Sequence, residues 1–238
     1  MNRELYCFDF ETTGTDPFKD RPVQVGLTHD RRILMNSLCD PYMPIADGAV
    51  AVHGITNEMV QGHPDYIFAL WTMLKLLPAP HQVILCGFNQ TTYDSVMLDT
   101  CLTVVSGSNP KDNFIGGKYD QLDILDLLYR YEPTLPSKKL GNAYKALTGT
   151  ELVGAHGAVV DCLGSARLLD TLCGKHEKTA EEFVQELRTP QAYSIMPLGK
   201  YAGQPIERVP ISWAQWMHHN ATNMRPDLQA TIDWILNV

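Results

Sequence analysis

The sequence predicts an α/β protein in which a mixed β-sheet is flanked by helices and followed by a small C-terminal module. Apolar, β-prone runs fill much of the first forty residues, and helical spacing then alternates with a short strand pattern. The last forty or so residues form a turn-rich segment with two short helical patterns. Strands that come first, followed by helices with further strand between them, are typical of layered α/β folds.

Three strands are predicted near the N-terminus, at Leu5–Phe10, Val23–Thr28 and Ile33–Leu38. Asp30-Arg31 between the second and third runs is typical of a tight turn, so this part of the sheet is expected to be antiparallel. A further short buried strand is expected at Val83–Cys86. Together these runs predict a sheet that mixes antiparallel and parallel neighbours.

Helices are predicted over most of the remaining chain. A loop rich in Pro, Gly and Asp covers 40–65 and leads into the first helical pattern. From there, apolar residues recur at helical spacing. The predicted helices are Tyr66–Leu77, Thr92–Val105, Gln121–Tyr131, Lys138–Leu147, Ala158–Leu172, a polar helix from a Thr179–Glu182 capping box to Leu187, and two short helices over 210–219 and 226–237.

The character of the sequence changes over residues 174–195, where the polar helix is broken by Arg188-Thr-Pro-Gln. A turn-rich segment, MPLGKYAGQPIERVP (196–210), follows. We therefore divide the chain into a main domain over 1–175, a linker helix and loop over 176–195, and a small module over 196–238.

Composition limits the classes of function. The net charge of −8 argues against a protein that coats nucleic acid through many phosphate contacts. An enzyme that holds only a chain end remains open, because bound metal ions supply local positive charge. The longest apolar stretch, Ile67–Leu77, is too short to span a bilayer, and the residues before the first strand do not lead us to expect a signal peptide. The six cysteines form no CxxC pair, so reduced thiols in a cytoplasmic protein with no membrane partner are expected.

The segment CFDFETTG (7–14) contains the first candidate site. Asp9 and Glu11 lie near the C-terminal end of a predicted buried strand, where alternate side chains point to the same face. Two adjacent carboxylates repel each other until a cation or a shared proton lies between them. The segment therefore indicates either a metal-binding pair or a strand end whose acids are simply hydrated.

Two further segments place acids near predicted helix starts. Asp94 follows a buried strand, which suits either a metal ligand or an ordinary acid favoured by the helix dipole. His156 and Asp161 would be about 140° apart on one straight helix and would not share a face. If the helix begins near Ala158, however, His156 lies in the preceding loop and both side chains point at one site. A surface histidine is the alternative interpretation.

The ordered set D-x-E, then D, then H-x4-D resembles the DEDDh family of 3′→5′ exonucleases (DnaQ-like). Here the set is Asp9-Phe10-Glu11, then Asp94, then His156 with Asp161, and AVAVHGITNEMV (49–60) resembles the family's segment between its first two motifs. TDPFKDRPVQ (15–24), FNQTTYD (88–94) and LPSKKL (135–140) are similar to exonuclease I. The tail, LGKYAGQPIERVP…WAQWM, and the HGAVVDC segment resemble exodeoxyribonuclease X, in a likeness that covers nearly the whole chain.

This resemblance implies a ribonuclease H-like fold, a mixed five-stranded sheet flanked by helices, with 1–175 as the exonuclease domain. It implies that Asp9, Glu11, Asp94 and Asp161 hold two Mg²⁺ ions, for which Mn²⁺ can substitute; hard oxygen ligands and a phosphate substrate suit Mg²⁺. One ion would generate hydroxide and the other would stabilise the leaving 3′-oxygen. His156 would be the general base, and the product a nucleoside 5′-monophosphate.

The implied substrate is a DNA 3′ end, preferably single-stranded or overhanging, in repair, recombination or end processing. Lys19, Arg21, Lys138 and Lys139 are candidates for phosphate contacts, although a solvated surface role is equally consistent with their scattered positions. The residues implied to bind substrate are Phe10, Thr12, Thr13, Gly14, His53, Ile55 and Asn89; Asn89 alternatively holds the loop before Asp94.

Two other functions remain open from the sequence. An exoribonuclease would use the same chemistry, because the choice of RNA depends on contacts to the terminal 2′-OH that the sequence does not specify. A proofreading-type accessory partner of a DNA polymerase would use the C-terminal module for association. Trp213, Trp216 and Trp234 would then be either anchors for that partner or, as we expect, part of a small core.

Overall fold

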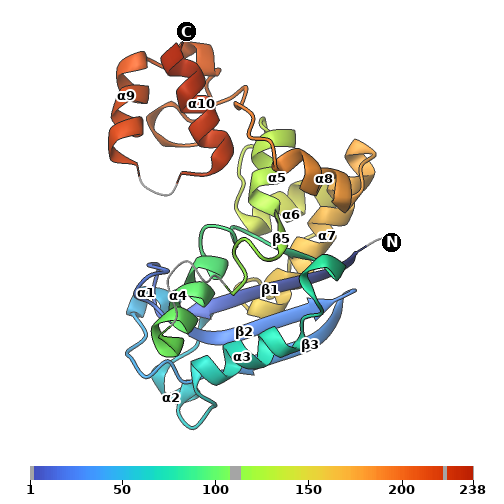
Figure 1. The fold of residues 1–238 in the computed structure, drawn as a ribbon, viewed down its shortest axis with the longest axis vertical. Coiled ribbons are helices and arrows are strands. Elements are labelled where there is room, and N and C mark those ends of the chain that lie inside the picture. The colour runs from blue at the N-terminus through green and yellow to red at the C-terminus, as the bar shows by residue number, and fades with distance from the viewer. Residues whose placement is uncertain (1–2, 108–113, 222–223, 238) are drawn as a thin grey trace.

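The computed structural model describes residues 3–107, 114–221 and 224–237 (Figure 1). Its centre is a five-stranded mixed sheet in the order β3-β2-β1-β4-β5. β1 pairs antiparallel with β2 and parallel with β4, while β3 and β5 form the edges. The strands are β1 (Glu4–Thr12), β2 (Pro22–His29), β3 (Arg32–Leu38), β4 (Val83–Gly87) and β5 (Asp120–Asp123).

The antiparallel start of the sheet is confirmed. Asp30 and Arg31, between β2 and β3, both have positive φ, at 45° and 64°. Two successive positive values are typical of the hairpin turn whose twist matches that of the flanking strands. The local sequence therefore correctly predicted this connection.

The helices cover both faces of the sheet. On one face, Tyr6, Phe8 and Phe10 of β1 pack with buried residues of α3 and α4. On the other, Cys7 and β4 residues pack with α5, α7 and α8. The helices of this domain are α1 (Asp47–His53), α2 (Asn57–Val60), α3 (Tyr66–Leu76), α4 (Asp94–Ser106), α5 (Ile124–Tyr131), α6 (Leu140–Thr148), α7 (Ala158–His176) and α8 (Ala180–Leu187), with a 3₁₀ turn at Pro80–Gln82.

The prediction of one helix over Gln121–Tyr131 is wrong at its beginning. Residues Asp120–Asp123 form β5, which pairs parallel with β4, and α5 begins only at Ile124. The Asp123 carboxylate accepts a hydrogen bond from the Leu125 backbone N–H at 3.0 Å, which caps the helix there. A four-residue edge strand with two aspartates lacks the apolar run by which sequence patterns reveal strands.

The predicted loop over 40–65 contains two short helices, α1 and α2. No residue of α1 is buried, so the helix has no apolar stripe that a periodicity search could detect. By contrast, the polar helix expected after Thr179 is confirmed as α8, with both hydrogen bonds of the capping box present. Sequence signals thus located capped and amphipathic helices and missed two short ones, of which α1 has no buried residue.

The C-terminal residues build a third core of their own. Two 3₁₀ turns, at Gly199–Tyr201 and Ile206–Arg208, are followed by α9 (Ile211–Asn220) and α10 (Pro226–Asn237). Tyr193, Met196, Ile206, Ala214 and Ile232 are among the buried residues of this core. In Figure 1 the module lies beyond α5, away from the sheet. The boundaries at 175 and 195 stay a prediction, because α8 packs into the main domain whereas Tyr193 already packs in the module.

The three tryptophans of the module behave differently from one another. Trp213 packs against the module core, as expected. Trp216 and Trp234 are 56% and 37% exposed, so the expectation that all three fill a core is wrong for these two. The six cysteines are all free thiols, and no helix in the described ranges is long and apolar enough to cross a membrane.

Candidate active site

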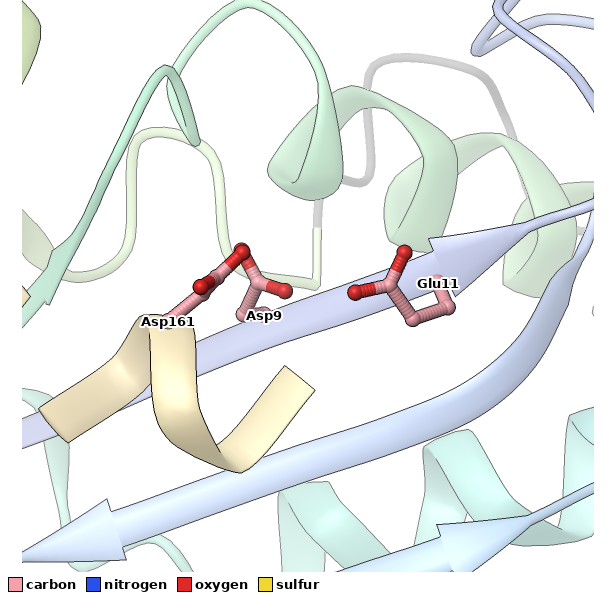
Figure 2. Close-up of side chains that lie close together, drawn as sticks. All are labelled: Asp9, Glu11 and Asp161. Carbon is pink, nitrogen blue, oxygen red and sulfur yellow. The ribbon is translucent and has the colours of Figure 1, made fainter. Parts of the chain in front are cut away.

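The pair Asp9 and Glu11 lies near the end of β1 and projects from one face of the sheet (Figure 2). Alternation along the strand separates them from Phe8 and Phe10, which are buried in the core on the opposite face. Glu11 is buried and Asp9 is half-buried. The alternation thus correctly predicted that the two acids share one face of the strand.

Asp161 reaches the same face from the first turn of α7. The helix can approach because Gly26 of β2, the register partner of Asp9, has no side chain. A Cβ added at Gly26 would lie 2.8 Å from the backbone carbon of Ala158. In addition, the Ala158 backbone N–H donates to the Gln24 side chain at 3.2 Å, which ties the start of α7 to β2.

The three carboxylates converge on one point. One oxygen each from Asp9, Glu11 and Asp161 lies within 4.8 Å of the others (Figure 2). The Oδ1 of Asp161 is buried and accepts no hydrogen bond from the described part of the chain. Hard oxygen donors at this spacing, one of them without a partner, fit a divalent cation such as Mg²⁺ or Mn²⁺.

The electrostatics of the cluster also favour a cation. Burial, with the neighbouring Asp94, Asp161 and Glu11 charges, raises the pKa of Asp9 well above its ordinary value. Burial and the Asp161 charge raise the pKa of Glu11 to about 7. Burial also raises the pKa of Asp161, although His156 opposes that shift. Without a cation the acids therefore resist ionisation together.

Asp94 is the first residue of α4, so the prediction that it starts a helix is confirmed. It does not belong to the group of three within 4.8 Å. Its Oδ1 accepts a hydrogen bond from the Phe10 backbone N–H at 3.0 Å, between the residues of the D-x-E pair. Burial raises the pKa of Asp94 to about 8, despite this hydrogen bond. Its carboxylate thus borders the cluster and anchors α4 to β1.

His156 lies in the loop before α7, which begins at Ala158 as the sequence analysis required. Its backbone has a φ of 69°, a conformation uncommon for a residue with a side chain. The side chain is exposed and lines the same cleft as Asp9, Glu11 and Asp161. A titratable imidazole therefore faces the cleft beside the acids.

The turn after β1 is held by Tyr93, a residue that the sequence analysis did not select. The Tyr93 hydroxyl donates to the Gly14 carbonyl oxygen at 2.6 Å and lies 2.8 Å from the Thr12 hydroxyl. Gly14 is required here, because an added Cβ would lie 2.5 Å from a carboxylate oxygen of Asp20. That carboxylate also accepts from the Thr13 hydroxyl. In the sequence, the feature that could have drawn attention to Tyr93 is its position directly before the candidate ligand Asp94.

His53 and Ile55 lie behind this turn. The Ile55 backbone N–H donates to His53 Nδ1 at 3.0 Å, so the imidazole Nε2 carries its proton toward the Thr12 carbonyl oxygen, 3.1 Å away. Burial lowers the pKa of His53, which favours this neutral form. Ile55 is buried in a small core with Val23. Both ring nitrogens of His53 are thus engaged by the backbone.

A cleft of about 1080 Å³ opens at the acids. Its walls are the acids with His156, the loop around Asn89 before α4, the segment 133–140 and residues 195–203, where the linker meets the C-terminal module. Of the residues predicted to bind substrate, Phe10 and Asn89 line this cleft. The lining does not include Thr12, Thr13, Gly14, His53 or Ile55.

The four basic residues proposed to contact phosphates separate into two groups. Lys138 and Lys139 line the cleft. Arg21 lies over the Tyr66 ring and donates to the Pro41 carbonyl oxygen, and Lys19 pairs with Asp16. Of the four, these two lysines are therefore the ones at the cleft, where Lys138 Nζ also donates to the carbonyl oxygens of Pro133 and Leu135.

Comparison with known proteins places this chain in a family. Residues 6–169 match the RNase T family model, which describes exonucleases. The match spans more than half of the chain, so the chain belongs to this exonuclease family. The predicted membership of the DnaQ-like superfamily is thereby confirmed.

One curated relative is the PolC-type DNA polymerase III of Halalkalibacterium halodurans. It is 25% identical over 176 residues, which cover 71% of this chain and 11% of the polymerase. This chain thus corresponds to a small part of that protein.

Among solved structures, Escherichia coli exonuclease I in complex with a dT13 oligonucleotide matches with a TM-score of 0.64 at 21% identity, covering 79% of this chain and 44% of that enzyme. The zinc-bound form of that enzyme with single-stranded DNA matches at 0.63 and 21% identity, covering 79% and 43%. This chain therefore spans less than half of those structures. The match confirms the predicted fold, a ribonuclease H-like mixed five-stranded sheet flanked by helices, whereas the likeness of the tail to exodeoxyribonuclease X stays a prediction.

Proposed function

We propose that this chain is a divalent-metal-dependent 3′→5′ exodeoxyribonuclease that releases nucleoside 5′-monophosphates from DNA 3′ ends. One observation supports this most strongly. Three carboxylates from β1 and α7 converge in an open cleft, and one of their buried oxygens has no hydrogen-bond partner in the described chain. Unpaired acids in a cleft that can admit a polymer suit phosphodiester hydrolysis.

In this proposal Asp9, Glu11, Asp94 and Asp161 hold two divalent cations, Mg²⁺ with Mn²⁺ as a substitute. When bound, such ions lower the pKa of a water and stabilise the leaving 3′-oxygen of an in-line displacement. The raised pKa values of the acids mean that cation binding must displace protons from the cluster. Hard carboxylate ligands favour Mg²⁺, and the zinc-bound form of E. coli exonuclease I makes Zn²⁺ a worthwhile comparison.

His156 acts in this proposal as the general base that removes the proton of the attacking water. Its exposed imidazole lines the cleft together with the acids. An imidazole that faces the attacking water can accept its proton, which suits this role. We expect His156→Gln to lower kcat by about 100-fold or more, the usual contribution of a positioned base.

The terminal nucleotide is proposed to lie against Phe10 and the Thr12-Thr13-Gly14 turn, with His53 and Ile55 supporting that turn from behind. Asn89 would contact the substrate backbone, and Lys138 and Lys139 would meet phosphates farther along the strand. The E. coli exonuclease I structures that match this fold contain single-stranded oligonucleotides. Single-stranded or overhanging DNA ends are therefore the preferred substrate of this proposal.

The test is a time course on single-stranded, 3′-overhanging and blunt DNA, with matched RNA, in Mg²⁺ and in EDTA. We expect metal-dependent release of monophosphates from DNA 3′ ends and none from Asp9→Ala. Equal or faster release from RNA would make the chain an exoribonuclease instead. Absence of release from every substrate would overturn the nuclease assignment.

The similarity to a PolC-type polymerase favours a second candidate, a proofreading-type partner of a DNA polymerase. The exposed Trp216 and Trp234 of the module would then contact the polymerase. Co-elution with a replicative polymerase in size-exclusion chromatography, lost on Trp216→Ala, would support it. Independent elution of the two proteins would reject it.

A further inference from the structure

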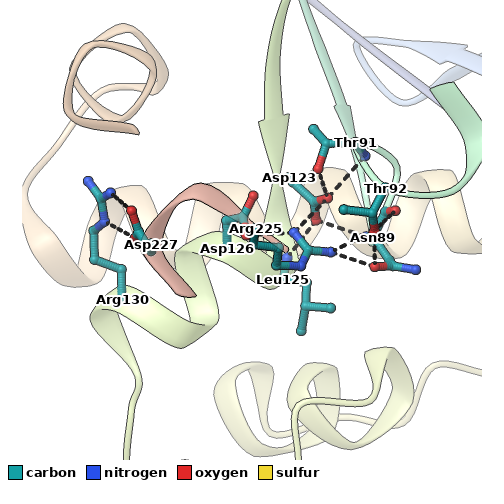
Figure 3. A network of polar contacts seen from close by, with 9 residues as sticks. All are labelled: Asn89, Thr91, Thr92, Asp123, Leu125, Asp126, Arg130, Arg225 and Asp227. Atoms are coloured by element: carbon teal, nitrogen blue, oxygen red, sulfur yellow. Dashed lines mark hydrogen bonds and ion pairs between the residues drawn. The ribbon is translucent and has the colours of Figure 1, made fainter. Parts of the chain in front are cut away.

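Arg225 is a buried cation that reaches out of the C-terminal module into the exonuclease domain (Figure 3). It directly precedes α10. Its Nη1 contacts Asp126 Oδ1 at 2.5 Å and Asp123 Oδ2 at 3.2 Å. Its Nη2 donates to Asn89 Oδ1 at 2.5 Å and to the Thr92 hydroxyl at 3.3 Å. One guanidinium thus joins the module to β5, α5 and the loop before Asp94.

The loop before Asp94 depends on this group. Asn89 has a φ of 64°, an uncommon conformation that the surrounding structure must hold. Its backbone N–H donates to Asp123 at 2.8 Å, and the Thr91 hydroxyl donates to the same carboxylate at 2.7 Å. Arg225 neutralises the carboxylate that accepts both bonds. Arg225 of the C-terminal module therefore helps to hold the conformation of this loop.

The guanidinium also decides how the Asn89 amide points. Arginine offers only donors, so the amide oxygen must face it, and the Thr92 hydroxyl donates to that same oxygen at 2.9 Å. Within the described chain no hydrogen bond uses the Nδ2 group. Because Asn89 lines the cleft, this orientation leaves two N–H donors for a ligand there. An acceptor, such as a phosphate or sugar oxygen, is what those donors would bind.

We propose that Arg225 is a positioning residue of the nuclease: it fixes Asn89 so that the Nδ2 amide donates to an oxygen of the substrate strand. This rests on the proposed function for the identity of the substrate. It assigns the C-terminal module a direct part in substrate binding, since the module supplies both Arg225 and the 196–203 part of the cleft wall.

The chain provides a matched control. Arg130 of α5 makes a second buried ion pair with the module, donating to Asp227 of α10 at 2.8 and 2.5 Å (Figure 3). Its side chain is 7% exposed, against 10% for Arg225. Its other contacts are the backbone oxygens of Glu186 and Thr189, so it does not touch the loop before Asp94. Arg130→Met therefore weakens the attachment of the module without removing a contact of Asn89.

The experiment compares the full-length wild type, Arg225→Met, Arg130→Met and Asn89→Asp. Steady-state release from a single-stranded oligonucleotide gives kcat and KM, and anisotropy of a labelled oligonucleotide in EDTA gives binding without cleavage. Thermal melting shows which variants are folded. Asn89→Asp keeps an oxygen toward Arg225 and replaces the cleft donors by an acceptor, so it tests the amide even if Arg225→Met fails to fold.

We expect Arg225→Met and Asn89→Asp each to raise KM by about tenfold and to weaken oligonucleotide binding by the same factor. A tenfold change is what the loss of one hydrogen bond to a charged group produces. Arg130→Met should lower the melting temperature with KM and binding within about twofold of wild type. Equal KM and binding for Arg225→Met and Arg130→Met, or wild-type binding by Asn89→Asp, would overturn the positioning role. If the wild type releases nothing, the proposed function fails, and the anisotropy comparison still decides the role of Arg225.

Discussion

Two clusters of carboxylates lie at the C-terminal ends of parallel strands, on either side of β4, and their surroundings differ in one decisive respect. At β1, Asp9 and Glu11 meet Asp161, and none of the three carboxylates forms an ion pair with a lysine or arginine of the described residues. At β5, Asp123 and Asp126 share the guanidinium of Arg225.

The pKa values follow this difference. Burial raises the pKa of Asp94, at the first cluster, to about 8. Burial raises the pKa of Asp126 only to about 6, because the charge of Arg225 opposes the shift. Arg225 pairs with one acidic cluster, whereas the other has no such partner, so the β1 cluster is the one available to the metal of the proposed function.

The largest expected effect is the loss of activity when the unpaired cluster loses a ligand. Asp161→Asn should lower kcat/KM for DNA hydrolysis by at least about 100-fold, because metal affinity and geometry both depend on this carboxylate. Its melting temperature in EDTA should equal or exceed that of wild type, since one like charge has been removed. An active variant would show that Asp161 is not a ligand.

The paired cluster should respond in the opposite way. Asp123→Asn removes the buried negative charge that faces Arg225. This carboxylate also accepts hydrogen bonds from the backbone N–H groups of Asn89 and Leu125. We expect a loss of about 1.5–3 kcal/mol in the free energy of unfolding, measured by urea denaturation, because hydrogen bonds to a charged acceptor are lost while Asp126 still pairs with Arg225. A stability equal to that of wild type would mean that the two clusters do not differ as described.

Gly26→Ala tests whether the close approach of α7 assembles the unpaired cluster. The added methyl would press on the backbone of Ala158 and displace Asp161. We expect a loss of about 1–3 kcal/mol in unfolding free energy and a fall in kcat of about tenfold or more. Gly48→Ala is the control, because an added Cβ there meets nothing within 4 Å, and it should keep the unfolding free energy and the kcat of wild type.

The smallest effect is a pH dependence of stability in the metal-free protein. Folding raises the pKa of Glu11 to about 7 and of Asp94 to about 8, so the folded state binds more protons than the unfolded state between about pH 4.5 and 8. Stability in EDTA should therefore fall as pH rises across this window, and the melting temperature should decrease with it. Mg²⁺ should restore more stability at pH 8 than at pH 6, because it binds the ionised acids. A melting temperature in EDTA that does not change with pH would contradict this account.

The two clusters also differ in how far the sequence could predict them. Asp9 and Glu11 stand out as charges in an apolar strand, and His156 before α7 places Asp161 beside them. These are local patterns, in which a few adjacent residues determine the geometry. The strand that carries Asp123 has four residues and two charges, so no such pattern exists.

The partner of Asp123 was equally hidden. Arg225 is 102 residues away along the chain, and only tertiary packing brings it to Asn89 and Asp123. For the same reason the sequence identified Asn89 as a candidate but not the direction in which its amide points. Local chemistry thus predicted the acids, and long-range contacts determined what surrounds them.

The central claim, that the β1 cluster is a metal site, is tested most directly by melting temperature during titration with Mg²⁺ or Mn²⁺. The comparison needs the wild type, Asp9→Asn and Asp126→Asn, all starting in the metal-free state. We predict that metal raises the melting temperature of the wild type and of Asp126→Asn and leaves that of Asp9→Asn unchanged. At a metal concentration of one hundred times the dissociation constant, the rise corresponds to about 2.7 kcal/mol of added stability. An equal rise in all three proteins, or a rise in none, would contradict the claim.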